Sequence, residues 1–152
     1  MEGEQDEKVK FISTRFGELE VASSALITII GGVIGFPNNE RFALLDYNPP
    51  FSWLHSVDSP DLAFVVVNGA EFGDGYRFTP PVGDRDLDLR SDDDVAIMNI
   101  VTVRPDPSFT TVNLKAPVVV NLRNRRGRQL VLDNPHFPTR MNLWATQEGE
   151  KK

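Results

Sequence analysis

The chain has 152 residues, no cysteine, and 22 acidic against 16 basic residues, which gives a formal net charge of −6. This length suits a single domain, and a chain without cysteine has no disulfides, thiolate nucleophiles or cysteine-ligated metals. An acidic chain is repelled by nucleic acid and by anionic membranes, and it is attracted to basic partners.

Both ends of the chain are polar and charged, so we expect one folded domain over residues 10–144 between flexible tails at residues 1–9 and 145–152. The first ten residues lack the apolar segment that defines a signal peptide. The longest apolar stretch, residues 25–36, contains three glycines and is too short to span a bilayer. We therefore expect a cytoplasmic protein without a membrane segment.

Short runs rich in β-branched and aromatic residues, separated by glycine, proline and asparagine, are typical of strands. We expect strands at residues 10–13, 18–21, 26–30, 42–46, 52–57, 62–67, 95–103, 111–114, 118–123 and 128–132. The run at residues 62–67 is apolar throughout, which predicts burial on both of its faces.

The breakers between these runs predict tight turns and little helix. The loop at residues 124–127 ends in Gly127, which we expect to supply the positive φ of a hairpin turn. Residues 38–42 and 84–90 are the two candidates for a helical turn. The chain is therefore predicted to be all-β, as a single small antiparallel β-barrel-like domain with one or two short helical turns.

Residues 99–132 hold four of the predicted strands and almost no reactive side chain, which favours a surface over a reaction centre. His55 and His136 are the only histidines, and neither lies in a metal-binding or nucleophile motif. The glycines at residues 31–35 lack the lysine and the following helix of a phosphate loop. We expect no catalytic residue, no cofactor and no metal site.

Two charged segments and one aromatic residue are the candidates for partner binding. Residues 84–94 contain six aspartates, and Leu89 and Val95 stand where a calcium loop needs glycine and glutamate. This segment is either a solvated loop or a docking surface for a basic partner. Phe72 lies beside Glu71 in a glycine-rich loop, where we expect it to face outward and anchor a partner.

Four arginines gather at the predicted hairpin of residues 123–128, namely Arg123, Arg125, Arg126 and Arg128. Arginines bind phosphate well, so direct RNA binding is one interpretation. No aromatic residues alternate with them as stacking platforms, which favours a soluble turn that protects a sheet edge.

Motifs across most of the chain carry a resemblance to a known family. They are TRFGE (residues 14–18), IGF (34–36), RFALL (41–45), PFSWLHSVDSPDLAFVV (50–66), NIVTV (99–103), TVNLKAP (111–117), GRQ (127–129) and FPTR (137–140). The chain resembles the FliW family of bacterial flagellar assembly factors. It departs from the family at residues 32–36, which lack the proline of the usual glycine-isoleucine-proline-glycine-phenylalanine segment, and its acidic loop is shorter.

The resemblance implies a non-catalytic regulator with a small β-barrel-like fold. FliW-like proteins bind newly made flagellin and also CsrA, an RNA-binding repressor of flagellin translation. Export of flagellin then frees the regulator to remove CsrA from the message. We expect an apolar groove for flagellin and no direct contact with nucleic acid or membrane.

The leading hypothesis is a partner-switching protein. The residues predicted to contact partners are Glu71, Phe72, Asp84, Asp86, Asp88, Asp92, Asp93 and Asp94. Two alternatives remain open: a small β-barrel enzyme acting on a carbohydrate or ester, and a direct RNA binder that uses the arginine hairpin. The enzyme would need converging acids in a pocket with shifted pKa values.

Overall fold

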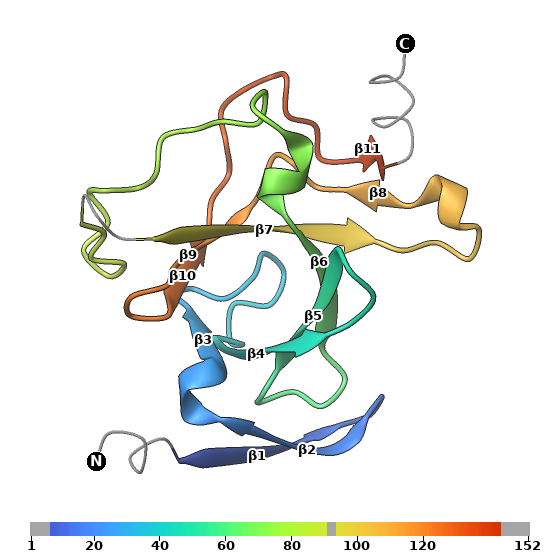
Figure 1. Ribbon diagram of the computed structural model, residues 1–152, viewed down its shortest axis with the longest axis vertical. Helices are drawn as coiled ribbons and strands as arrows, with labels where there is room; N and C mark the ends of the chain where they lie inside the picture. Colours follow the sequence, from blue (N-terminus) through green and yellow to red (C-terminus); the bar gives the residue numbers. More distant parts are fainter. Residues whose placement is uncertain (1–6, 91–93, 144–152) are drawn as a thin grey trace.

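The computed structural model describes residues 7–90 and 94–143, and its centre is a closed barrel of seven strands (Figure 1). Each strand pairs with the next around the ring, and the last pairs with the first. In ring order the strands are β3 (Leu26–Ile29), β4 (Arg41–Asp46), β5 (Phe51–Ser56), β6 (Ala63–Asn68), β7 (Val95–Thr102), β9 (Val118–Asn121) and β10 (Arg126–Gln129).

Strand direction alternates around the barrel except where β10 lies parallel to β3. A closed ring with an odd number of strands cannot alternate throughout, so at least one parallel pair is required. The predicted antiparallel, barrel-like domain is therefore confirmed, with one parallel pair that the sequence analysis did not foresee.

Strand β7 connects the barrel to the outer strands of the same nine-stranded sheet. Its first half, residues 95–98, pairs with β9 in the barrel, while Val101 and Thr102 pair with β8 (Thr111–Val112) outside it. Strand β8 in turn pairs with β11 (Met141–Asn142), which no prediction included. The outer strands therefore extend from the far end of β7 (Figure 1).

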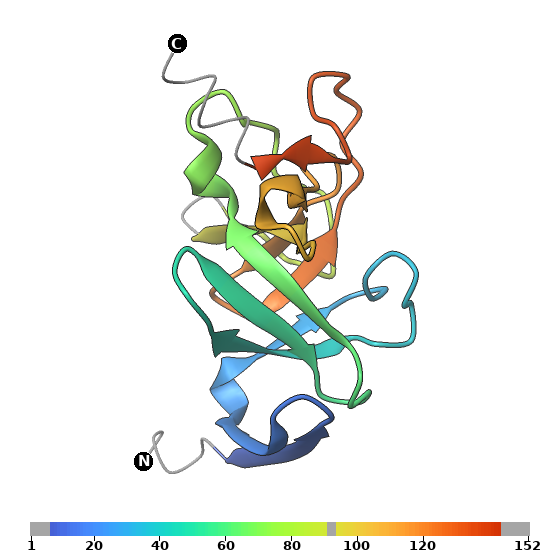
Figure 2. The same ribbon diagram turned by 90° about the vertical axis from the view of Figure 1, so that its right-hand side faces the viewer.

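A separate hairpin of β1 (Lys8–Ser13) and β2 (Gly17–Ala22) lies below the barrel (Figures 1 and 2). Phe11 is buried and its ring lies 5.5 Å from that of His55 on β5. The backbone N–H of Thr14 in the hairpin turn also donates to the carbonyl of Pro60, at 2.9 Å. The hairpin tip is therefore attached to the β5–β6 end of the barrel.

The sheet separates two hydrophobic cores. Val66 on β6 points into the barrel with Phe42 and Leu54, whereas Val65 and Val67 point outward to a second cluster that contains Tyr76. Side chains alternate across a strand, so three consecutive valines fill both cores. The predicted burial on both faces is confirmed for Val65, Val66 and Val67, whereas residues 62–64 at the start of the run are half-buried.

The hairpin of β9 and β10 corrects one prediction about backbone geometry. The turn occupies residues 122–125, and the residue with positive φ is Arg125, at 61°. Gly127 instead lies within β10, where a Cβ atom would come within 2.8 Å of the backbone oxygen of Val119. Glycine is needed there for close packing of strands, not for the turn.

The two predicted helical turns also differ from the structure. Residues 38–42 form no helix, because Arg41 and Phe42 already belong to β4, where they pair with neighbouring strands. Residues 84–90 contain one turn, closed by the N–H of Asp88 and the carbonyl of Asp84 at 3.1 Å. The short 3₁₀ helices are η2 (Ser23–Ala25), η3 (Gly69–Phe72) and η4 (Pro107–Phe109).

No helix within residues 7–90 and 94–143 is both long and apolar enough to cross a membrane.

Candidate protein-binding surfaces

The predicted acidic segment and the predicted arginine hairpin lie against each other. Arg128 donates from Nε to Asp84 at 2.5 Å and from Nη2 to Asp86 at 2.9 Å. Arg123 donates to the carboxylate of Asp88 at 3.1 Å. We call residues 84–88 together with the β9–β10 hairpin the charged clasp.

Backbone groups add to the charged clasp. Leu87 is fully buried, and its carbonyl accepts hydrogen bonds from the side chains of Asn121, at 3.0 Å, and Asn124, at 2.9 Å. Asp88 and Arg125 are the two non-glycine residues with positive φ in the described chain, and they lie on the two halves of the clasp. Such backbone is stable only where surrounding contacts enforce it.

The central ion pair of the clasp is partly shielded from water. The side chains of Asp84 and Arg128 are 14% and 32% exposed. The hydrogen bond from Arg128 holds the pKa of Asp84 below its ordinary value, and the same bond raises the pKa of Arg128. This pair therefore stabilises the fold more than an open surface pair, which contributes about 0–1 kcal/mol.

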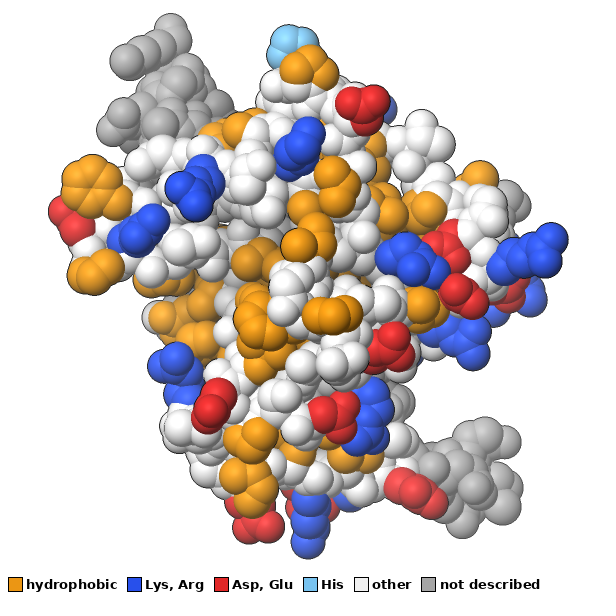
Figure 3. Space-filling model, turned by 180° about the vertical axis from the view of Figure 1, so that it is seen from behind, with side chains coloured by type: hydrophobic (Ala, Val, Ile, Leu, Met, Phe, Trp, Pro, Cys, Tyr) orange, Lys and Arg blue, Asp and Glu red, His pale blue; other side chains and the backbone are white. Residues whose placement is uncertain are grey.

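The clasp joins the two charged segments, which were predicted as separate patches, into one surface of mixed charge. Mixed blue and red side chains cover the right-hand margin of Figure 3, where this region lies when the molecule is seen from behind. Three of the predicted acidic contacts thus already face arginines of the same chain. Arg126 donates to the carbonyl of Asp86, and Arg125 donates to that of Ser24, so these guanidinium groups are engaged within the protein and not arranged as an open RNA surface.

The remaining predicted contacts are spread over other places. Asp94 is exposed and lies just before β7, whereas Asp92 and Asp93 lie outside the described residues. Glu71 is exposed in η3. Phe72 is half-buried, with its ring edge-on to Tyr76 at 5.9 Å, so the expectation that it faces outward is wrong because the second core takes it up.

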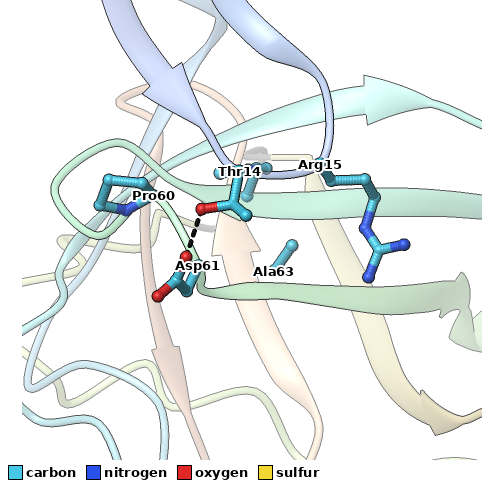
Figure 4. Close-up of a pocket in the computed structure, with 6 residues that line it drawn as sticks. Thr14, Arg15, Pro60, Asp61 and Ala63 are labelled. Carbon is cyan, nitrogen blue, oxygen red and sulfur yellow. Dashed lines mark hydrogen bonds between the residues drawn. The ribbon is translucent and has the colours of Figure 1, made fainter.

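A cavity of about 320 Å³ lies where the hairpin tip meets the β5–β6 loop. Thr14 and Arg15 come from the hairpin, and Pro60 and Asp61 come from the loop opposite (Figure 4). The hydroxyl of Thr14 donates to the carboxylate of Asp61. The cavity is therefore closed on one side by a contact that fixes the hairpin.

His55 lines this cavity, and both of its ring nitrogens are engaged. Nδ1 lies 2.7 Å from the carbonyl of Ser56, and Nε2 lies 2.8 Å from the hydroxyl of Ser13. With Asp61 as its one carboxylate, the cavity lacks the converging acids that the enzyme alternative requires. In the described part of the chain, no group of three acidic or histidine side chains could hold a metal ion.

An apolar groove of about 250 Å³ opens on the outer face of β5 and β6. Its floor contains Val65 and Val101, which are paired neighbours on β6 and β7. One wall is the β4–β5 turn and the other is the β7–β8 connection. The full lining is Tyr47, Asn48, Pro49, Phe51, Val65, Val101, Val103, Pro107, Thr110 and Leu143.

Sequence reasoning expected an apolar groove but did not name these residues. The groove combines residues from four separate parts of the chain, so no local pattern marks it. The available signal was weaker: apolar side chains such as Tyr47, Val103 and Phe109 occur next to proline-rich turns, where they are left exposed.

The comparison with known proteins agrees with the fold. The model of the family described as "FliW protein" matches residues 10–143. The chain belongs to the FliW family. A FliW of Caldicellulosiruptor saccharolyticus is 39% identical over 131 residues, which cover 85% of this chain and 86% of that protein.

Other FliW proteins are similar over most of their length. The flagellar assembly factor FliW of Syntrophus aciditrophicus is 34% identical, with 92% of this chain and 90% of that protein covered. A crystal structure of the flagellar assembly factor FliW superimposes with a TM-score of 0.79 at 30% identity, and covers 89% of this chain and 96% of that one. The resemblance seen in the sequence motifs is therefore confirmed.

Proposed function

We propose that this FliW-family protein is a cytoplasmic, non-catalytic regulator that binds flagellin and antagonises the translational repressor CsrA by exchanging one partner for the other. The observation that carries the proposal is the match of the FliW family over residues 10–143, together with relatives named as flagellar assembly factors. Exchange needs only mass action: the tighter and more abundant partner holds the protein.

The acidic segment is the docking surface that we propose for CsrA, with help from Glu71, which is exposed in η3. Carboxylates attract a basic RNA-binding protein and speed its encounter. Asp94 is exposed and therefore accessible to a partner. The carboxylates of Asp84 and Asp88 instead form ion pairs with arginines of the clasp. A basic partner that reached those two carboxylates would have to compete with the protein's own arginines.

Titration of the purified protein with CsrA, followed by addition of flagellin, tests the exchange. We expect CsrA to bind and flagellin to release it. A protein that binds neither partner would refute the proposed function. A gel shift with flagellin leader RNA in the absence of CsrA separates this function from direct RNA binding, because we expect no shift.

The docking surface is tested by charge reversal. The triple variant Asp92→Lys, Asp93→Lys and Asp94→Lys should slow association with CsrA by about tenfold or more at low salt and weaken its salt dependence.

A matched control carries the same change in net charge at exposed acids of other segments: Glu18→Lys, Asp46→Lys and Asp133→Lys. If both triple variants bind CsrA equally well, the acidic segment is not the docking site.

A further inference from the structure

The apolar groove continues into a wider apolar surface. Across the outer face, Trp53 pairs with Val65, and Val65 pairs with Val101. Tyr47 packs on Trp53 with ring centroids 5.1 Å apart. A row of apolar side chains therefore crosses three neighbouring strands and meets the groove at its centre.

Apolar side chains at the rim of the groove are exposed to solvent. Val103 is 55% exposed, and Phe109 in the adjoining β7–β8 connection is 63% exposed. Figure 3 shows hydrophobic side chains projecting at the margin formed by this connection. Exposed apolar residues beside an apolar groove are the usual anatomy of a protein-binding site.

Two arginines flank this surface, although the chain as a whole is acidic. The Arg15 guanidinium lies over the Trp53 ring at 4.8 Å from its centroid, and Arg104 lines a second depression with Phe109. Among the described residues neither arginine forms an ion pair.

Two acids lie near these arginines, because Asp61 lines the same cavity as Arg15 and Asp106 lines the same depression as Arg104, but no ion pair joins either couple in the described part of the chain. Asp106 turns toward its own helix, where it accepts from the N–H and the hydroxyl of Ser108. Asp46 shares the face of β4 that carries Phe42, which is opposite to the face of the groove. The surface therefore has an apolar centre, and at each end it carries an arginine that forms no ion pair within the described residues.

We propose that this groove is the flagellin-binding surface, and that it takes an amphipathic segment whose apolar side chains are flanked by carboxylates. The proposal rests on the proposed function for the identity of the partner, and on charge complementarity for the chemistry of the bound segment. Arg15 and Arg104 pair with the flanking carboxylates, while Val103, Phe109 and Tyr47 cover the apolar side chains.

Binding of purified flagellin, measured by titration calorimetry, tests the proposal with variants of exposed residues. The double variant Val103→Ser and Phe109→Ser should bind flagellin at least tenfold more weakly, because both anchors are lost. Arg104→Glu should also weaken binding, and the loss should shrink at high salt. Binding of CsrA should be unchanged in each of these variants.

Val131→Ser is the matched control, because Val131 is 64% exposed and does not line the groove. We expect it to bind flagellin as the unaltered protein does. Thermal unfolding of each variant verifies that it is folded before binding is compared.

The outcomes separate the two proposals. If the unaltered protein binds flagellin and the double variant binds equally well, the groove is not the site, while the proposed function stands. If the unaltered protein does not bind flagellin at all, both proposals fail. If sedimentation shows a dimer that the double variant abolishes, the groove's occupant is a second copy of the chain and the flagellin site is overturned.

Discussion

Replacing Tyr76 by phenylalanine tests the polar centre of the second core. The Tyr76 hydroxyl donates to the carbonyl of Leu114 at 2.7 Å and accepts from the side-chain amide of Asn99 at 2.8 Å. Its ring packs edge-on against Phe137 with centroids 4.9 Å apart. Tyr76→Phe keeps that ring contact and removes only the hydroxyl.

The expected loss in the free energy of unfolding follows from the two hydrogen bonds that the Tyr76 hydroxyl makes. Asn99 keeps one hydrogen bond from its amide to the carbonyl of Asn113, at 2.9 Å. The carbonyl of Leu114 loses the hydroxyl donor in a buried place, and an unsatisfied buried group costs about 1–3 kcal/mol. With the lost bond from Asn99 included, we expect the free energy of unfolding to fall by about 2–3 kcal/mol. For a domain of this size that lowers Tm by roughly 5–10 °C.

Urea unfolding followed by tryptophan fluorescence measures the change. Tyr47→Phe is the matched control, because Tyr47 is 44% exposed and no hydrogen bond of its hydroxyl is seen in the described part of the chain; its effect should stay below about 0.5 kcal/mol. If Tyr76→Phe also stays below that value, the hydroxyl is not the organising group of the second core.

The same residue predicts a dependence on alkaline pH. Burial raises the pKa of Tyr76 above its ordinary value of 10.0, and the hydrogen bond from Asn99 opposes the rise. The folded state therefore holds this proton more tightly than the unfolded state. Its contribution to stability is complete below pH 10 and declines as pH rises through the folded-state pKa, and the difference in stability between the unaltered protein and Tyr76→Phe should shrink over that range.

Three further predictions concern single contacts. Gly127→Ala should cost about 1–3 kcal/mol, because its Cβ would meet the backbone of β9, whereas Gly83→Ala, which meets nothing within 4 Å, should be nearly neutral; equal effects would contradict the close packing. Asp84→Asn should lower stability at neutral pH and remove the part of the acid-induced loss that appears as pH falls below about 4, since the pKa of Asp84 is depressed in the fold; an unchanged acid profile would refute this. Ser13→Ala should speed amide exchange in the β1–β2 hairpin, because the hydroxyl holds both the hairpin turn and His55; unchanged exchange would show that the hairpin is held by other contacts.

The strands were predictable because their pattern is local. Alternation or continuous apolar character marks each run, and the apolar run of β6 even predicted its burial on both faces. Strand β11 was missed because two residues, Met141 and Asn142, carry no periodicity and are ordered by pairing with β8. The start of β10 was misplaced because Arg125, and not Gly127, adopts the positive φ.

The candidate surfaces depend on contacts that a linear sequence does not display. Asp84 and Arg128 are 44 positions apart, so two segments that were read as separate charged patches form one clasp. Phe72 was expected to face outward, but it packs against a core that includes Tyr76 and residues far along the chain. Family motifs identified the protein's relatives, but they located neither the charged clasp nor the apolar groove.

Strand β7 sets the spacing between the two proposed docking places. It starts at Val95, beside Asp94 and the clasp, and ends at Thr102, next to Val103 on the groove, and its eight residues span about 26 Å at the usual rise per residue. A short flagellin peptide in the groove would leave the acidic end open, so a ternary complex is the expected state with such a peptide. Displacement of CsrA would then require full-length flagellin, whose bulk reaches across that distance, or a shift transmitted along the strand itself.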